Sequence, residues 1–294
     1  MKSKVEAKGL CVSYKDVEAL SGLNFTLEDG KTYGLIGRNG AGKTSLLSLL
    51  AAYQKETSGH IKIDGESIFE NEKAVAQVTF IHQTDYKDEY DTVNDFFEVA
   101  ERYRPTFDRT YAEELVERFQ LPTTKPLRKL STGMQSAFNV TIGLASRTPI
   151  TIFDEAYQGM DVPTRELFYQ EVLEEQARNP RLFILSTHLV SEMEYLFDEV
   201  LMIHKGKLLV QEELDSLLQK GFSVTGSSGA VDDVVAGLHV LSEQQLGGTK
   251  SVMVYGELPK EKEVDVEQKG LEVGNVSLHD LFIQLTKEGN DHHE

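Results

Sequence analysis

The stretch TYGLIGRNGAGKTS, residues 32–45, decides the fold of this chain. Its first five residues, Thr32 to Ile36, predict a short strand, and the leucine spacing between Lys43 and Tyr53 predicts a helix. Between them, GRNGAGKT at residues 37–44 satisfies the pattern GxxxxGK followed by Ser or Thr. The sequence therefore predicts a strand, a glycine-rich loop and a helix in direct succession, which is the context of a phosphate-binding loop.

This loop has the residue types that hold a polyphosphate. Its glycines let backbone N–H groups point inward, and the N-terminus of the following helix adds its positive end. We expect Lys43 to reach the β and γ phosphates of a nucleotide, and the Thr44 hydroxyl to bind Mg²⁺. The alternative, a glycine-rich turn with a surface lysine, is disfavoured by the flanking strand and helix. The residues expected to contact the phosphates are Gly37, Arg38, Asn39, Gly40, Ala41, Gly42, Lys43, Thr44 and Ser45.

Two carboxylates follow a second apolar run. The segment TIFDE, residues 151–155, reads as a buried parallel strand that delivers Asp154 and Glu155 to the carboxyl edge of the sheet, where ligands bind. Asp154 is suited to organise Mg²⁺, and Glu155 to accept a proton from an attacking water. Two acids after a strand are by themselves more often the start of a loop. Together with the phosphate loop, they indicate nucleotide hydrolysis.

Alternating strands and helices predict an α/β protein with a mixed sheet. Residues Val5 to Tyr14 and Leu23 to Leu27 alternate apolar and polar side chains, which predicts an antiparallel edge layer. Helical patterns from Thr92 to Arg118 indicate an inserted helical subdomain spanning about residues 84–150. Past Val210 short strands and helices predict a small α+β domain. We therefore expect a nucleotide-binding domain over residues 1–220 and a C-terminal domain over 221–294.

Composition limits the classes of partner. The 294 residues carry a formal net charge of -18, which argues against general binding to nucleic acid or anionic lipid. No segment approaches the roughly 20 apolar residues of a membrane-spanning helix, and the polar N-terminus does not resemble a secretory signal. We expect a cytoplasmic protein whose membrane role, if it has one, depends on a partner. The single cysteine, Cys11, reads as a strand thiol without a functional role.

From about Val5 to Val210 these motifs resemble, in the right order, the ATP-binding subunits of ABC transporters. The resemblance implies that Gln83 is the glutamine that contacts Mg²⁺ or water and couples the site to the transporter. It implies that His188 is the switch histidine at the γ-phosphate. Tyr14 is similar to the aromatic residue that stacks on adenine, and Asp161 to the acid that faces a second subunit. Taken alone, each has a structural alternative, such as a solvated loop glutamine or a half-buried strand tyrosine.

The segment that resembles the family's LSGGQ signature reads LSTGM at residues 130–134. Ser131 and Gly133 are retained, and the resemblance implies that they meet the γ-phosphate held by another subunit. The missing glutamine and arginine predict weaker dimer closure and slow or partner-dependent hydrolysis. The segment QGMD, residues 158–161, also differs from the family pattern. These departures resemble the sequences of bacitracin- or YtrB-like subunits, which serve ABC-2-like permeases.

The resemblance implies an ATP- and Mg²⁺-dependent ATPase that closes into a homo- or heterodimer. Such a dimer energises a transmembrane permease, most simply an exporter, from the inner face of the cell membrane. Two other classes stay open at this point. One is an ABC ATPase that acts on a soluble partner, although the chain has one phosphate loop and no long coiled-coil insert. The other is a regulatory module in which the C-terminal domain binds a small molecule.

Overall fold

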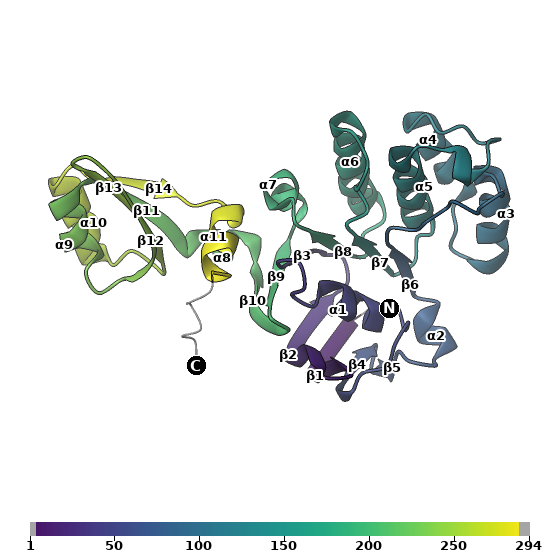
Figure 1. Cartoon of the computed structure of the whole chain (residues 1–294), viewed down its shortest axis with the longest axis horizontal. Coiled ribbons are helices and arrows are strands. Elements are labelled where there is room, and N and C mark those ends of the chain that lie inside the picture. The colour runs from purple at the N-terminus through teal and green to yellow at the C-terminus, as the bar shows by residue number, and fades with distance from the viewer. Residues whose placement is uncertain (1–3, 288–294) are drawn as a thin grey trace. The chain divides into compact units, whose positions relative to one another are not determined.

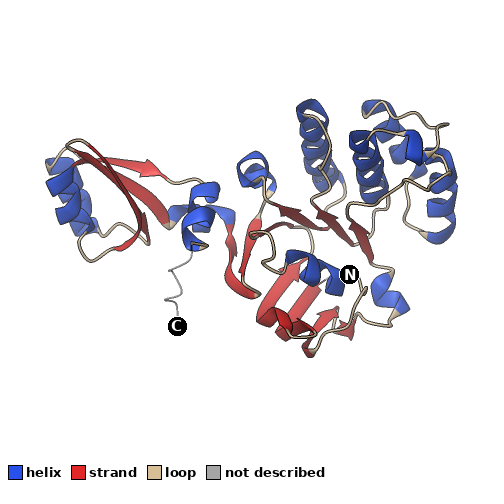
Figure 2. Ribbon diagram, in the orientation of Figure 1, coloured by secondary structure: helices blue, strands red, loops and turns tan. Residues whose placement is uncertain are grey.

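The computed structural model describes residues 4–287, which form two compact units. The first unit comprises the chain up to His188 together with Tyr195–Gln211, and the second comprises Leu189–Glu194 with the chain from Glu212 onward. Figure 1 shows the order of the elements, and Figure 2 shows that both units combine helices and strands. The predicted α/β class is confirmed.

A six-stranded sheet organises the first unit, with the order β10-β9-β3-β8-β7-β6. The pairs β3–β8, β3–β9, β7–β8 and β6–β7 are parallel. Because β3 and β8 are buried along their whole length, their apolar runs show no alternation. The strands are β3 (Thr32–Ile36), β6 (Val78–Ile81), β7 (Ile150–Asp154), β8 (Leu182–Thr187), β9 (Glu199–His204) and β10 (Lys207–Glu213).

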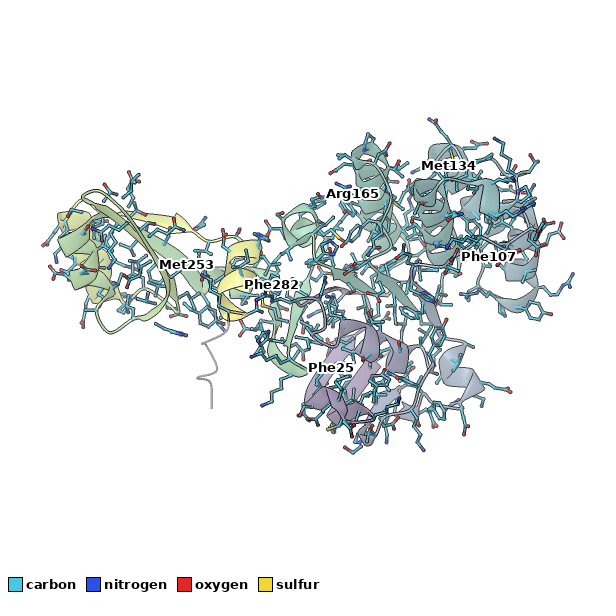
Figure 3. All side chains as sticks on the ribbon, in the orientation of Figure 1. Phe25, Phe107, Met134, Arg165, Met253 and Phe282 are labelled. Atoms are coloured by element: carbon cyan, nitrogen blue, oxygen red, sulfur yellow. The ribbon has the colours of Figure 1, made fainter. Side chains whose placement is uncertain are left out.

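An antiparallel sheet with the order β2-β1-β4-β5 forms the predicted edge layer. Its inward side chains, Phe25 among them, share one core with the leucines of α1 and with Ile150 and Ile184 of the parallel sheet (Figure 3). Helix α1 thus lies between the two sheets (Figure 1). The bounds are β1 (Lys4–Tyr14), β2 (Val17–Glu28), α1 (Lys43–Leu50), β4 (Ser58–Ile63) and β5 (Glu66–Ser67).

Helices cover the other face of the parallel sheet, and three of them form the helical region between β6 and β7. Helix α3 begins with a capping box, in which Thr92 and Asp95 exchange hydrogen bonds, and α4 is capped by Asp108. Helix α5 packs on α4, α6 and the strands β6 and β7. The bounds are α2 (Glu72–Val75), α3 (Val93–Tyr103), α4 (Arg109–Arg118), η1 (Leu127–Lys129), α5 (Thr132–Ala145), α6 (Val162–Arg178) and η2 (Glu194–Leu196).

The second unit contains a β-α-β-β-α-β run whose sheet has the order β12-β13-β11-β14, with every neighbouring pair antiparallel. This is the ferredoxin-like topology. Valines of β11, β13 and α9 form its core, and α11 packs on α7. The bounds are α7 (Val190–Met193), α8 (Leu214–Gln219), β11 (Gly221–Ser227), α9 (Ser228–Val235), β12 (His239–Leu246), β13 (Thr249–Tyr255), α10 (Lys260–Gln268), β14 (Glu272–Asn275) and α11 (Leu278–Leu285).

Candidate functional site

The parallel register brings the sequence-predicted residues to one edge of the sheet. The phosphate loop leaves β3, Gln83 follows β6, Asp154 ends β7, and His188 follows β8. These four strands are linked by parallel pairs, such as Asp154 opposite Ser186 and Ile36 opposite Thr187. Their carboxyl ends therefore meet at the same edge, which is where ligands bind in such sheets.

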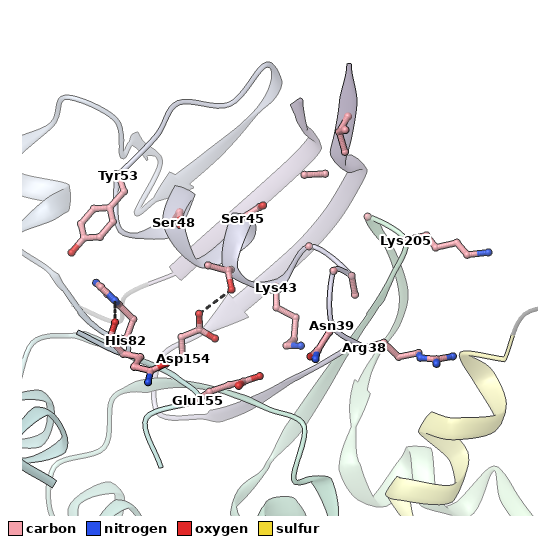
Figure 4. Close-up of a pocket in the computed structure, with 18 of the residues that line it drawn as sticks. Arg38, Asn39, Lys43, Ser45, Ser48, Tyr53, His82, Asp154, Glu155 and Lys205 are labelled. Atoms are coloured by element: carbon pink, nitrogen blue, oxygen red, sulfur yellow. Dashed lines mark hydrogen bonds between the residues drawn. The ribbon is translucent and has the colours of Figure 1, made fainter. Parts of the chain in front are cut away.

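A cavity of about 750 Å³ lies at this edge. Figure 4 shows Lys43, Asp154 and Glu155 in the middle of the site, with Tyr53 and His82 towards one end and Arg38 towards the other. The cavity is lined by Val17, Glu18, Ala19, Arg38, Asn39, Gly40, Ala41, Gly42, Lys43, Thr44, Ser45, Ser48, Tyr53, Phe80, His82, Gln83, Asp154, Glu155, Gln158, Lys205 and Gly206.

The glycine-rich loop keeps a conformation that needs glycine. Gly42 has a φ of 109°, and a Cβ at this position would lie 2.6 Å from the backbone oxygen of Ala19. The Lys43 side chain is buried, and its Nζ donates to the backbone oxygen of Gly37 at 2.6 Å. Burial lowers the pKa of Lys43 from its ordinary value of 10.5, while Glu155 and Asp154 act in the opposite direction. The loop therefore presents a cation beneath a concave backbone, which suits a polyphosphate.

Thr44 and Asp154 form a pair of oxygen donors suited to Mg²⁺. The Thr44 hydroxyl donates to Asp154 Oδ2 at 3.1 Å, and Gln83 lines the same cavity. Within residues 4–287 there is no cluster of three or more His, Cys, Asp or Glu side chains that could hold a metal by itself. A hydroxyl, a carboxylate and an amide oxygen fit Mg²⁺, which commonly takes one or two carboxylates and completes its shell with water and substrate phosphates.

Glu155 is held on both carboxylate oxygens. Its Oε1 lies 3.2 Å from Nδ1 of His188, and its Oε2 accepts a hydrogen bond from Nε2 of Gln158. Its backbone has a φ of 49°, a left-handed conformation that costs a non-glycine residue about 1–3 kcal/mol and is concentrated at functional sites. His188 lies beside the cavity and does not line it.

Besides His188, five sequence-predicted residues lie outside the cavity lining: Gly37, which begins the phosphate loop, and Ser131, Gly133, Asp161 and Tyr14. Ser131 caps α5 by accepting from the backbone of Met134 at 3.3 Å, and Gly133 packs closely on the loop before α6. Asp161 caps α6. Tyr14 is exposed, and its hydroxyl donates to Gln54. Adenine stacking by Tyr14, and the roles of Ser131, Gly133 and Asp161 towards a second subunit, stay predictions.

The sequence analysis missed several residues of the site. Phe80, His82 and Tyr53 form an aromatic cluster at one end of the cavity, with Phe80 and His82 ring centroids 5.0 Å apart. Phe80 lies in β6 and His82 directly follows this strand, a spacing that signals only a strand, while Tyr53 follows α1. Tyr157 contacts His188, and Gln158 contacts Glu155. No motif predicted these two contacts, because they depend on how β7 lies beside β8.

Comparison with known proteins agrees with this geometry. The sequence profile of the ABC transporter family matches residues 20–158, which include the phosphate loop and both carboxylates. The chain carries an ABC transporter ATP-binding domain. This is a domain of a family of ATPases, and the predicted fold and enzyme class are confirmed.

Two curated relatives of this ABC protein are named as ATP-binding proteins of transport systems. It is 29% identical over 217 residues to the ABC transporter ATP-binding protein YtrB of Bacillus subtilis, and the matched residues cover 74% of each chain. It is 27% identical to the bacitracin transport ATP-binding protein BcrA of Bacillus licheniformis, over 97% of this chain and 98% of the relative. The likeness to bacitracin- and YtrB-type subunits predicted from the sequence is thereby confirmed.

Solved structures share the fold. An ATP-binding subunit of an ABC transporter matches with a TM-score of 0.65 at 22% identity, covering 72% of this ABC protein and 91% of that chain. A dimeric ATP-binding cassette bound to ADP and Pi matches with a TM-score of 0.62 at 18% identity, covering 71% and 98%. Within residues 4–287, no helix is both long enough and apolar enough to cross a membrane.

Proposed function

We propose that this ABC protein hydrolyses ATP in a dimer and thereby energises a separate membrane permease, as an exporter subunit at the inner face of the cell membrane. One observation carries the proposal. Lys43, the Thr44–Asp154 pair and Glu155 face one cavity, whereas Ser131 and Gly133 lie outside it. A site with donors on one side only is completed when a second copy or a related subunit supplies the signature residues.

The residues divide the work as follows. Lys43 and the backbone amides of the phosphate loop hold the phosphates, and Thr44, Asp154 and Gln83 would hold Mg²⁺. When bound, this ion neutralises charge on the β- and γ-phosphate oxygens. Glu155 accepts a proton from the attacking water, and His188 contacts the γ-phosphate. Ser131 and Gly133 of the second subunit close the site.

Loss of the γ-phosphate removes the group that joins the two halves, and they separate. The residues between Gln83 and Pro126 carry this movement to the permease in our proposal. These residues follow the cavity-lining end of β6 and include α3 and α4, so they begin in the site and continue into the helical region. The curated relatives named for transport support a membrane partner.

The test uses Glu155→Gln, which keeps the shape of the side chain and removes its basicity. With ATP and Mg²⁺ we expect this variant to accumulate as a dimer in size-exclusion chromatography and to show no turnover. Glu66→Gln, an exposed change on the edge strand β5, is the matched control and should behave like the wild type. Rapid hydrolysis by Glu155→Gln would refute the assigned role.

The membrane partner is tested with the same trapped variant, purified from its native cell in gentle detergent with ATP and Mg²⁺. We expect a polytopic membrane protein among the copurifying chains identified by mass spectrometry. Enrichment of a soluble enzyme or of ribosomes in place of it would overturn the transport proposal and leave the ATP chemistry standing.

A further inference from the structure

The hydroxyl of Tyr157 lies at the centre of a buried network beside the catalytic carboxylate. It lies 3.1 Å from Thr187 Oγ1, 3.3 Å from the backbone nitrogen of His188 and 3.1 Å from Nδ1 of the same histidine. Tyr157 and Thr187 are both buried. The loop that follows β7 is thereby bonded to the end of β8, where His188 begins its own loop.

The proton arrangement around this hydroxyl is constrained. The backbone N–H of His188 can only donate, and Thr187 Oγ1 donates to the phenol oxygen as well. A phenol proton donated to Nδ1 of His188 requires an unprotonated acceptor there. In a neutral ring this places the proton on Nε2.

We propose that Tyr157 is a positioning residue that holds His188 in the tautomer protonated on Nε2. This tautomer makes Nε2–H the donor of the ring, and the His188 side chain is about half exposed, so a phosphate oxygen can reach it. The proposal rests on the function proposed above for His188 at the γ-phosphate. Tyr157 touches no phosphate in this scheme and acts only through the histidine.

Glu155 favours the opposite tautomer of His188, so a second group is needed to hold the proton on Nε2. Its Oε1 lies 3.2 Å from the same Nδ1 and favours a proton there, because an N–H donor to a carboxylate is stabilised while a bare nitrogen lone pair is repelled. Nδ1 thus has two neighbours with opposite requirements. Gln158 holds the other carboxylate oxygen, so Glu155 stays close to the histidine. Removing the Tyr157 hydroxyl leaves Glu155 to decide the tautomer, and the proton moves to Nδ1.

The direct test is ¹⁵N NMR of the full chain with labelled histidine, comparing the wild type with Tyr157→Phe. The chain has eight histidines, and His188→Gln assigns the resonance. We expect Nδ1 of His188 to show the shift of an unprotonated nitrogen in the wild type and of a protonated one in Tyr157→Phe. The matched control is Tyr33→Phe, which removes another buried hydroxyl that accepts from the backbone of Glu28 at 2.7 Å, at the opposite end of β3.

An unchanged His188 tautomer in Tyr157→Phe, or a wild type already protonated on Nδ1, would overturn the proposal. Tyr157→Phe keeps the buried ring, and a thermal melt beside Tyr33→Phe identifies any loss that is only structural. This spectroscopic result does not depend on turnover. A wild type that hydrolyses no ATP therefore refutes the proposed function, while the tautomer still decides the role of Tyr157.

Kinetics supply the second readout. Loss of one hydrogen bond to the histidine predicts about a tenfold fall in kcat for Tyr157→Phe, with the KM for ATP unchanged because the phosphate loop is intact. In a His188→Ala background the same change should cause no further fall, since the histidine through which it acts is gone. An equal fall in both backgrounds would show that Tyr157 acts independently of His188 and would overturn the proposal.

Discussion

Replacing Glu175 by Leu should destabilise the first unit more than any surface change on the same helix. Glu175 lies on α6 with no exposed surface. Its carboxylate accepts from Arg181 Nη1 at 2.7 Å and from Arg147 Nε at 3.0 Å. Arg181 is also buried, and burial lowers the pKa of its guanidinium while Glu175 opposes that shift. Glu175 and Arg181 thus form a buried ion pair, in which each charge compensates the other.

The expected magnitude follows from the charge that would be left behind. Removing one partner of a buried pair costs about 3–5 kcal/mol, because the remaining charge is uncompensated. For a unit of this size, about 1 kcal/mol corresponds to roughly 2–4 °C, so the midpoint should fall by about 6–20 °C. The partly exposed Arg147 keeps its second partner, Asp108, and adds little to this loss.

The assay is thermal unfolding and urea unfolding of the full chain, both followed by circular dichroism, for three variants. Glu174→Leu is the control, because Glu174 is the neighbouring residue on α6, is 46% exposed and pairs with Arg118 and Arg178 at the surface. It should cost no more than about 1 kcal/mol. Glu175→Leu combined with Arg181→Met should be more stable than Glu175→Leu alone. The reasoning is refuted if Glu174→Leu and Glu175→Leu cost the same.

Three further predictions concern single features. Gly42→Ala forces a side chain into a left-handed backbone against a backbone oxygen 2.6 Å away; we expect at least about a tenfold loss of ATP affinity by calorimetry, and wild-type affinity would contradict this. Burial lowers the pKa of Lys43, and bound phosphates should raise that pKa again. The affinity for ATP should therefore be full below the lowered pKa and should fall as the pH rises through that pKa. Calorimetry from pH 8 upward measures this affinity, and an affinity that rises with pH would exclude the explanation. Gly59→Ala should destabilise the chain more than Gly65→Ala, since both residues have positive φ but only Gly59 meets a neighbour, at 2.1 Å; equal unfolding midpoints would count against this.

Most of the first unit could be predicted from the sequence, because its strands are short apolar runs that end in chemically distinct residues. The edge where Asp154 and Lys43 meet follows from parallel pairing alone. The sequence of the second unit shows a weaker apolar periodicity than that of the first. Strand β12 is largely exposed and α10 buries a single residue, Val266, so neither shows a clear periodicity, and both were missed.

The parts of the site that could not be predicted share one physical cause. The contacts of Tyr157 and Gln158 depend on the turn after β7, where Glu155 takes its left-handed conformation and Gly159 has a φ of 80°. A sequence pattern reports which strand a residue follows. It does not report which way a turn directs the side chains that come after it.

Gln158 shows why this turn matters for the proposal that a second subunit completes the site. Its side chain donates to Glu155, and its backbone oxygen accepts from Ser136 of α5 at 2.6 Å. Helix α5 begins at the signature segment, with Ser131 as its cap. The signature helix and the carboxylate proposed to activate water are therefore bonded to the same residue. A second subunit that engages Ser131 and shifts α5 would move Gln158, and with it the hydrogen bond that holds Glu155.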